Sequence, residues 1–418
     1  MSLSDLKHTL RKFEFPICAR EALIRIEQLL VGRAAPSTKQ LDIAMDIISE
    51  FVFCESDRRG GRRGGGLTPL QELQLIEIMC DYLSACTNET TKNTVFLSLF
   101  GGMESQRRLK ILSILASMAV SASSTPVLPS NTPAATSSTP VLLAVGVWLQ
   151  QMGCSSVQSL QLVENVIRDH FSLNTSNQVA LRSLANSAPQ FVSNFITAVT
   201  ELYMHDMQGS KKLPPKNLLE VITSWVYSSP TLCMSAQLNP AALPSGSIPM
   251  AAVTPLAGLI HWCALAPLYI DEDSEMVEVP VPAKKIKYEG EKERTIVKTV
   301  NNNPLTEAEL YIKLHLGVLH SLRAGRRTHG PPTAVNAQHL AALAPLVQAY
   351  AHNVLERGGK LQHDKKLQDC LHRIGQAVQV ALANGCVYGN ISNLLAALDT
   401  LPENRLLRII IKTHQQVI

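Results

Sequence analysis

The stretch TPLQELQLIEIMCDYL, residues Thr68 to Leu83, decides the fold class of this chain. Thr68 suits a helix N-cap, Pro69 suits the first helical position, and Gln71 completes a capping box. Past the first turn, the polar residues are Gln74, Glu77 and Asp81. Their spacing of three and four residues places them on one narrow strip, and the rest of the helix surface is apolar. We therefore expect a helix that is buried on more than one side, as in a stack of helices.

A second stretch, TPLAGLIHWCALAPL from Thr254 to Leu268, supports the same interpretation. It also begins with Thr and Pro, and His261 is the one strongly polar side chain after the expected cap. A helix needs about twenty apolar residues to cross a bilayer, and this stretch is shorter. We expect a buried core helix in which His261 bonds to a backbone group.

The composition fits stacked helices better than a nucleic-acid-binding protein. Of 418 residues, 46% are hydrophobic and 17% are charged, which allows a large apolar core. The net charge of +4 is small, whereas proteins bound mainly to phosphate backbone have a stronger basic excess. The chain shows neither an apolar signal core nor a run of about eighteen apolar residues, so we expect an intracellular protein that does not span a membrane.

Helical periodicity extends over most of the chain, and no stretch alternates like a strand bounded by turn dipeptides. We expect an all-α fold of stacked antiparallel helix pairs, like HEAT or armadillo repeats, with a C-terminal helical group. The expected helices cover residues 17–31, 40–54, 69–86, 89–100, 105–121, 140–152, 155–171, 176–187, 189–206, 215–228, 254–266, 305–323, 334–357, 363–385, 390–400 and 403–414.

Three segments interrupt the helical pattern and suggest how the chain is divided. Residues 56–66 are rich in Arg and Gly, and residues 121–140 are rich in Ser, Thr and Pro. Both are expected to be disordered inserts within an N-terminal helical-repeat array over residues 1–270. Residues 271–304 change from acidic to basic and are expected to be a flexible charged linker, followed by a C-terminal helical domain over 305–418.

The Arg/Gly segment is the best indication of a contact to RNA or to a partner. Its arginines are Arg58, Arg59, Arg62 and Arg63. Arginines on a flexible backbone can pair with phosphates, but no aromatic residue is interleaved here for base stacking. We therefore prefer a solvated loop between two helices, and an RNA-binding adaptor is the alternative.

A short basic cluster in the charged linker suits a nuclear-localisation signal. Lys284, Lys285 and Lys287 follow Pro282 in a segment that should be exposed. Import receptors bind extended basic peptides of this type. Short basic clusters are also common on solvated linkers, which is the alternative interpretation.

No pattern of catalytic, cofactor-binding or metal-binding residues is found. The nine cysteines form no Cys-x-x-Cys pair, which suits buried thiols in a reducing compartment. His363, Cys370 and His372 lie on one expected helix, but His372 points away from the other two. We expect no metal, no cofactor and no enzymatic activity.

The three tryptophans each lie in an apolar helical run. They are Trp148, Trp225 and Trp262. Core packing is the preferred role, and a binding hot spot for a partner helix is the alternative, because Trp is enriched at such sites.

Seven blocks, in a fixed order, give the chain a resemblance to a known family. The blocks are EFVF at 50–53, the stretch at 68–83, PQFVSNFITAVTELY at 189–203, PPKNLLEVITSWVYSSPTL at 214–232, the stretch at 254–268, LYIKLHLGVLHSL at 310–322 and IGQAVQVALANGC at 374–386. The chain thereby resembles the Integrator complex subunit 15 family of metazoan nuclear proteins, and we expect an invertebrate member. It departs from the family in inserts near 58–66 and 122–139, and it has no Pro/His-rich tail after Ile418.

This resemblance implies a function that the residues alone do not. It implies a non-catalytic scaffold subunit of Integrator, the nuclear complex that binds paused RNA polymerase II and cleaves nascent transcripts, including small nuclear RNA precursors. It also implies that the protein links the module of subunits 10, 13 and 14 to the rest of the complex, with the endonuclease and phosphatase in other subunits. We expect a nuclear protein with protein partners and without direct contact to nucleic acid.

Overall fold

The capping box expected at Thr68 is present and starts helix α4 (Pro69–Ala85). The Thr68 N–H donates to Gln71 Oε1 at 2.9 Å, and the Gln71 N–H donates to Thr68 Oγ1 at 3.3 Å. Two N–H groups that a first helical turn leaves unpaired are satisfied in this way. The helix therefore begins at Pro69, as the sequence predicts.

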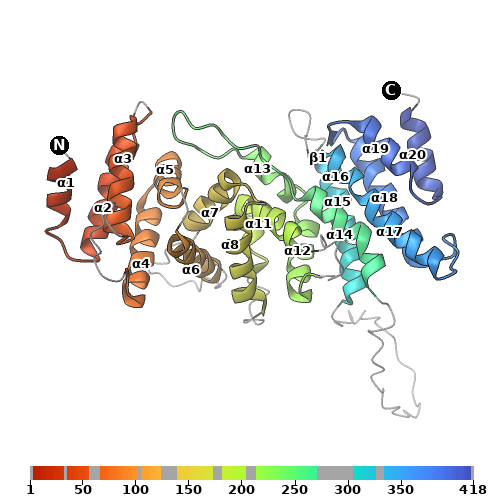
Figure 1. The fold of residues 1–418 in the computed structure, drawn as a ribbon, viewed down its shortest axis with the longest axis horizontal. Coiled ribbons are helices and arrows are strands. Elements are labelled where there is room, and N and C mark those ends of the chain that lie inside the picture. The colour runs from red at the N-terminus through yellow and green to blue at the C-terminus, as the bar shows by residue number, and fades with distance from the viewer. Residues whose placement is uncertain are drawn as a thin grey trace, which may run out of the picture.

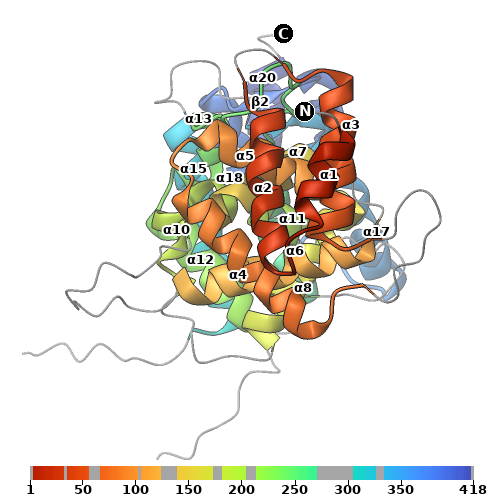
Figure 2. The same cartoon turned by 90° about the vertical axis from the view of Figure 1, so that its left-hand side faces the viewer.

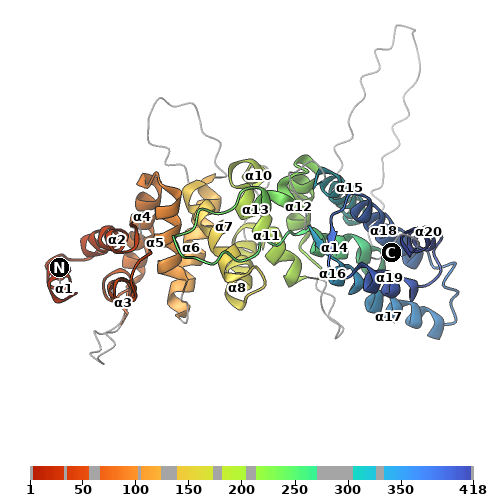
Figure 3. The same ribbon diagram turned by 90° about the horizontal axis from the view of Figure 1, so that it is seen from above.

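In the computed structural model, the helices follow one another along the long axis from the N-terminus to the C-terminus (Figure 1). Figure 3 shows the same progression from above, and Figure 2 shows the N-terminal end, formed by α1 to α4. The structure describes residues 3–32, 35–55, 66–101, 105–123, 139–172, 181–203, 213–270, 305–325 and 334–415. The all-α class is confirmed, and this stack is compatible with the HEAT- or armadillo-like interpretation.

The first half of the stack is helical throughout its described residues. Its elements are α1 (Leu3–Leu10), α2 (Ile17–Leu30), α3 (Thr38–Ile47), the π-helix η1 (Ile48–Val52), α4 (Pro69–Ala85), α5 (Glu89–Phe100), α6 (Gln106–Ser123), α7 (Thr139–Met152), α8 (Val157–Ile167), the π-helix η2 (Arg168–Ser172), α10 (Leu184–Ser187) and α11 (Pro189–Leu202).

The second half adds two very short strands to the helices. Its helices are α12 (Lys216–Ser228), the 3₁₀-helix η4 (Leu232–Met234), α13 (Ser235–Leu238), α14 (Leu256–Tyr269), α15 (Glu307–Gly325), α16 (Ala337–Ala341), α17 (Leu343–Glu356), α18 (Lys365–Ala383), α19 (Ile391–Asp399) and α20 (Arg405–Gln415). Strands β1 (Val335–Asn336) and β2 (Val387–Tyr388) are parallel, with Val335 opposite Val387. The expectation of no strand is wrong here, because two residues are too few for the alternation that identifies strands in a sequence.

One continuous apolar core runs through the stack, from Leu6 in α1 to Ile411 in α20. Helix α12 packs against α15, and α14 packs against both α15 and α18, so helices on either side of residues 271–304 share this core. The predicted linker itself lies outside the described residues, and the division of the chain at that point stays a prediction.

Close packing in the first half depends on a glycine. A Cβ atom added at Gly146 of α7 would lie 2.9 Å from the backbone N and Cα of Phe191 in α11. The Asn194 side-chain amide, also on α11, donates to the Gly146 carbonyl at 2.8 Å. The absence of a side chain at 146 therefore allows the two helices to touch through their backbones.

The structure differs from the expected helices at several ends. Helix α1 has no counterpart among the expected helices, and the helices expected at 40–54 and 155–171 end in the π-helices η1 and η2. The expected helix 334–357 is divided into β1, α16 and α17. Helix α6 extends to Ser123 and α7 begins at Thr139, so helical structure reaches both ends of the predicted Ser/Thr/Pro insert.

Helix α14 begins differently from the expectation. Its first residue is Leu256, and Thr254 makes no cap. Thr254 is buried, and its hydroxyl donates instead to the carbonyl of Ala334, the residue before β1. A threonine that resembles an N-cap in the sequence therefore ties α14 to a segment 80 residues later in the chain.

Helix α4 is also less enclosed than the sequence predicts. Leu70 and Leu73 are 66% and 55% exposed, although both belong to its apolar surface. Glu72 is buried instead, and its carboxylate pairs with Lys110 of α6 at 2.7 Å. The first turn thus presents Glu72 to α6 and the two leucines to solvent.

All three tryptophans are buried, which confirms their core role. Trp148 Nε1 donates to the Phe100 carbonyl at 2.9 Å, and Trp225 Nε1 donates to the Leu181 carbonyl at 3.0 Å. The ring of Trp262 lies edge-on to Tyr203, with 6.1 Å between the ring centroids. None of the described helices combines the length and hydropathy that a membrane crossing requires.

Replacing Trp262 by Ala should lower the free energy of unfolding by about 3–5 kcal/mol, because the change leaves a large cavity in the core. Denaturant unfolding of the free protein measures this difference. The control is Phe13→Ala, which removes an exposed aromatic ring and should cost less than about 1 kcal/mol. A Trp262→Ala protein as stable as the wild type would show that the ring does not hold this core together.

Candidate interaction surfaces

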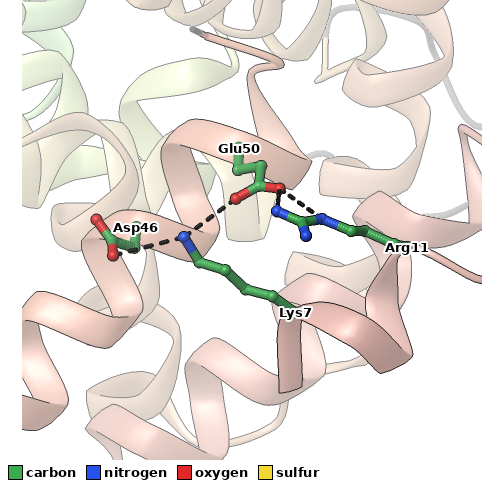
Figure 4. Close-up of polar contacts among 4 residues, drawn as sticks. All are labelled: Lys7, Arg11, Asp46 and Glu50. Carbon is green, nitrogen blue, oxygen red and sulfur yellow. Dashed lines mark hydrogen bonds and ion pairs between the residues drawn. The ribbon is translucent and has the colours of Figure 1, made fainter. Parts of the chain in front are cut away.

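A cluster of four charged residues holds α1 and the residue after it, Arg11, against the end of α3 and the π-helix η1 (Figure 4). Lys7 Nζ lies 3.5 Å from Asp46 and 3.1 Å from Glu50 Oε2. Arg11 donates to Glu50 Oε1 from Nε at 3.0 Å and from Nη2 at 2.7 Å. The Glu50 side chain is only 11% exposed, so these ion pairs are poorly screened by solvent. They fix the terminal helix of the stack in one orientation.

A second ion pair joins the first helices to α6. Arg108 is buried, and its Nε donates to Glu55 Oε1 at 3.1 Å. Its Nη2 also donates to Ser49 Oγ at 3.0 Å, and the guanidinium lies over the ring of Phe53, 4.7 Å from the centroid. A buried arginine needs such partners, because an unpaired buried charge is strongly unfavourable. Arg108 therefore fixes the segment that follows η1.

An apolar stripe lies exposed on α2 at this end of the stack. Ile17, Ile24 and Val31 recur every seven residues, which places them on one side of the helix and its C-cap. Beside the stripe, Arg20 pairs with Asp81 of α4 at 3.5 Å. Exposed apolar residues with a polar rim are typical of protein-binding surfaces. We define Ile17, Ile24 and Val31 as the α2 stripe.

An arm formed by residues 239–255, between α13 and α14, reaches back along the stack towards α5 (Figure 1). Asn93 of α5 donates from Nδ2 to the Ala242 carbonyl at 2.9 Å. Gln150 of α7 donates from Nε2 to the Met250 carbonyl at 3.3 Å. Side-chain amides of two earlier helices therefore hold the arm by its backbone.

The arm presents apolar side chains to solvent. Its turn includes Gly246, with φ of +84°, and reaches the neighbourhood of Ala35. Ile248 is 88% exposed, and Met250 and Val253 are also exposed. An apolar segment held in place by its backbone leaves these side chains available to a partner.

The residues that the sequence indicates for RNA binding and import are not placed by the structure. They are Arg58, Arg59, Arg62 and Arg63, and Lys284, Lys285 and Lys287, all of which lie outside the described residues. Both roles stay predictions. The sequence in turn did not identify the ion cluster or the arm, because each depends on contacts between distant segments, and it did not show which side of α2 stays exposed.

The histidines do not form a metal site within the described part of the chain. Over those residues, no group of three or more His, Cys, Asp or Glu side chains is placed to hold a metal ion. Cys370 is buried, whereas His363 and His372 are exposed. His261 has the expected backbone partner, the His339 carbonyl at 2.6 Å, but it is half-buried rather than in the core.

The cysteines are free thiols, and several lie deep in the core. Burial raises the pKa to about 12 for Cys154, Cys233, Cys263 and Cys370. Thiols with such a pKa stay protonated at neutral pH and react slowly. Their role is to fill space in the core.

His315 is a buried histidine held in its neutral form. Its Nε2 lies 2.9 Å from Gln376 Oε1 on α18, and Nδ1 has no hydrogen-bond partner among the described residues. Burial lowers the pKa of His315, the bond to Gln376 offsets part of this effect, and nearby Arg373 and His372 lower the pKa further. Burial also lowers the pKa of His170.

Acidification should therefore destabilise the protein. Below about pH 6.5, these histidines bind protons in the unfolded state but not in the folded state. The part of the unfolding free energy that depends on their neutral form is therefore complete above that pH and is lost as the pH falls towards the folded pKa. His315→Gln should reduce the slope of unfolding free energy between pH 7 and pH 5, measured by denaturant unfolding. His363→Gln, at an exposed site, is the control and should keep the wild-type slope. Equal slopes for the wild type, His315→Gln and His363→Gln would show that His315 does not cause this pH dependence.

Comparison with known proteins gives consistent matches over the whole stack. A family model described as Integrator complex subunit 15 matches residues 4–134 and 131–403. Integrator complex subunit 15 of Drosophila melanogaster is 33% identical over 429 aligned positions, which cover all of both chains. The proteins of the same name from Mus musculus and Homo sapiens are each 28% identical, over 98% of this chain and 87% of theirs. The higher identity to the fly protein fits the expectation of an invertebrate member.

Proposed function

Because the chain belongs to the Integrator complex subunit 15 family, we propose that it is a non-catalytic assembly subunit of the nuclear Integrator complex. The observation that carries this proposal is the extent of the match, which begins within α1 and ends before α20. In the finer proposal, the protein links the module of subunits 10, 13 and 14 to the rest of the complex. It would thereby serve RNA polymerase II transcription attenuation and 3′-end processing of small nuclear RNA.

The shape of the molecule supports a linking role. A long stack of helices offers separate surfaces to separate partners. The α2 stripe lies at the N-terminal end, the arm lies along the middle, and α19 and α20 lie at the C-terminal end (Figure 1). Partners bound at these places would be held apart at distances fixed by the stack.

The buried charges support a structural role as well. Glu50 and Arg108 are each engaged by groups from neighbouring elements, and both fix one helix against another. Such pairs make the stack stiff at its N-terminal end. A linking subunit needs to be stiff, because a flexible connector would not hold the module in a fixed position.

Depletion of this protein tests the linking role directly. Subunit 10 is tagged at its own locus, and its partners are recovered from nuclear extract before and after depletion. Subunits 13 and 14 should still be recovered with subunit 10, whereas the remaining Integrator subunits should be lost. Tagged wild-type protein, expressed again, should restore them and should itself be recovered in near-stoichiometric amount.

Two outcomes would contradict parts of this proposal. Recovery of the tagged protein without any Integrator subunit would contradict membership of the complex. Unchanged recovery of all subunits with subunit 10 after complete depletion would contradict only the linking role.

We expect Lys284, Lys285 and Lys287 to act in nuclear import. Replacing all three with Ala should reduce nuclear accumulation when the protein is produced in excess of its partners, since an assembled subunit can enter on another chain's signal. Quantitative fluorescence of a tagged protein gives the nuclear fraction. The control replaces Lys39, Lys360 and Lys412 with Ala, three exposed lysines among the described residues, and should leave the fraction unchanged. Equal nuclear fractions for the triple variant and the wild type would rule out the signal.

A further inference from the structure

The arm, residues 239–255, joins helices that lie far apart in the stack (Figure 1). It leaves α13, turns at Gly246 and returns to α14. A Cβ atom built on Gly246 would lie 3.5 Å from the Cβ of Ala35, so the turn reaches the connection between α2 and α3. One short segment therefore extends from the middle of the stack to its N-terminal helices.

Side-chain amides of α5 and α7 hold both legs of the arm by their backbone. On the outgoing leg, Asn93 donates to the Ala242 carbonyl at 2.9 Å. On the returning leg, Gln150 donates to the Met250 carbonyl at 3.3 Å, and the Met250 N–H donates to Gln151 Oε1 at 3.4 Å. Asn93 and Gln150 are both buried, and buried amides are nearly always hydrogen-bonded. The arm supplies an acceptor to each of them.

The side chains at the tip of the arm contribute little to this attachment. All seven residues from 245 to 251 are exposed, and Ile248 is 88% exposed. The arm has no charged residue, so neutral hydrogen bonds and not ion pairs hold it. Such bonds add little net stability, because water replaces them when they break. A segment held mainly by a few of them opens far more readily than a packed core does.

The position of the arm matters because a stack of helices is free to bend. Each helix pair in such a stack contacts mainly its neighbours, so small rotations between pairs add up along it. Helix α2 packs against α3, α4 and α5, its neighbours in the stack. The arm adds a connection from α13 and α14, which come much later in the chain, and a connection between distant helices opposes bending.

We propose that the arm is a releasable strap. When it is bound, it holds the N-terminal helices in one position relative to the middle of the stack. When it is released, these helices rotate while the apolar core stays folded. Pro240, Pro244, Pro249 and Pro255 restrict the backbone of both legs, so the released arm keeps few conformations and returns to its bound position. This property belongs to the free chain and does not depend on membership of the Integrator complex.

Distances between pairs of spin labels in the free full-length protein test the proposal. The labels are attached to p-acetylphenylalanine, because thiol labels would react with the nine native cysteines. Val157, which is 76% exposed on α8, is the reference position. Its distance to position 248 reports the arm, and its distance to the exposed position 39 on α3 reports the N-terminal helices. The pair 157 and 316, on α8 and α15, is the control, since none of the bonds of the arm described above joins these helices.

Gly246→Ala should release the arm. Gly246 has φ of +84°, where a residue with a side chain is strained, and release relieves this strain. The ratio of the broad, released component to the narrow, bound component at 157 and 248 should rise about five- to thirtyfold, which is the cost of a side chain in the left-handed region. The distribution at 157 and 39 should broaden with it. Gly358→Ala introduces the same kind of strain at φ of +73° between α17 and α18, and should change neither distribution.

A second variant removes one of the bonds that hold the arm. Asn93→Ala should raise the same ratio about two- to tenfold, the usual net worth of one hydrogen bond. Asn353→Ala, at an exposed site on α17, is the matched control and should leave the ratio unchanged. Thermal unfolding that matches the wild type shows that the core of each variant stays folded.

A disulfide holds the arm in its bound position. Ala35→Cys combined with Gly246→Cys places the two Cβ atoms about 3.5 Å apart, which suits a disulfide. Once this bond has formed, as mass spectrometry confirms, the distributions at 157 and 248 and at 157 and 39 should both be narrow. Gly246→Cys alone has the same strain without a partner at position 35, and should give the broad distributions of Gly246→Ala.

Four results would overturn the proposal. The first is an unchanged ratio at 157 and 248 in Gly246→Ala, which would show that the arm does not come away. The second is a released arm with an unchanged distribution at 157 and 39, which would show that the arm does not hold the N-terminal helices. The third is equal broadening at 157 and 316, which would indicate a general loosening of the core. The fourth is a broad distribution in the disulfide-bonded protein.

Discussion

Helix α14 has almost no polar side, and the exclusion of water from it is the constraint on which the rest of the molecule depends. Helix α11 covers it from the N-terminal half, and α15, α16 and α18 cover it from the C-terminal half. Because one apolar helix must be enclosed from both directions, the two halves are joined into one core. Trp262 at its centre contacts Tyr203 of the N-terminal half, so the same helix also carries the aromatic contact across the junction.

The ends of a stack differ from its middle, because a terminal helix has a neighbouring helix on only one side. At the N-terminal end, the ion cluster around Glu50 holds α1 in place where apolar contacts are fewer. Partly buried ion pairs of this kind fix the orientation of a helix, since their geometry is satisfied in one arrangement. The α2 stripe remains exposed beside this fixed helix, and a fixed apolar surface binds a partner with less loss of conformational entropy than a mobile one.

The sequence predicted the elements whose signals are local. The capping box at Thr68, the apolar run of α14 and the burial of the tryptophans all follow from neighbouring residues, and all are found. Thr254 was misread as an N-cap because its partner, the Ala334 carbonyl, lies far along the chain. Leu70 and Leu73 were expected to be buried, since nothing in the sequence indicates that Glu72 would turn inward to meet Lys110. The ion cluster and the arm were missed for the same reason, because each depends on contacts between segments that are distant in the sequence. The α2 stripe lies on one helix, but the sequence does not show which side of that helix the neighbouring helices leave exposed.

Pro267 shows how the loss of one backbone hydrogen bond inside a helix can produce a contact between two helices. A proline inside a helix removes one backbone bond, and a sequence reading would treat it as a kink. In this fold the freed carbonyl of Cys263 is bonded by Arg373 from α18, which ties two core helices together and draws a guanidinium to the edge of a pocket. Arginine can serve both purposes because its planar group has five donors, and one bond to a carbonyl leaves the others available. The same residue therefore ties α14 to α18 and keeps the other donors of its guanidinium at the adjacent surface.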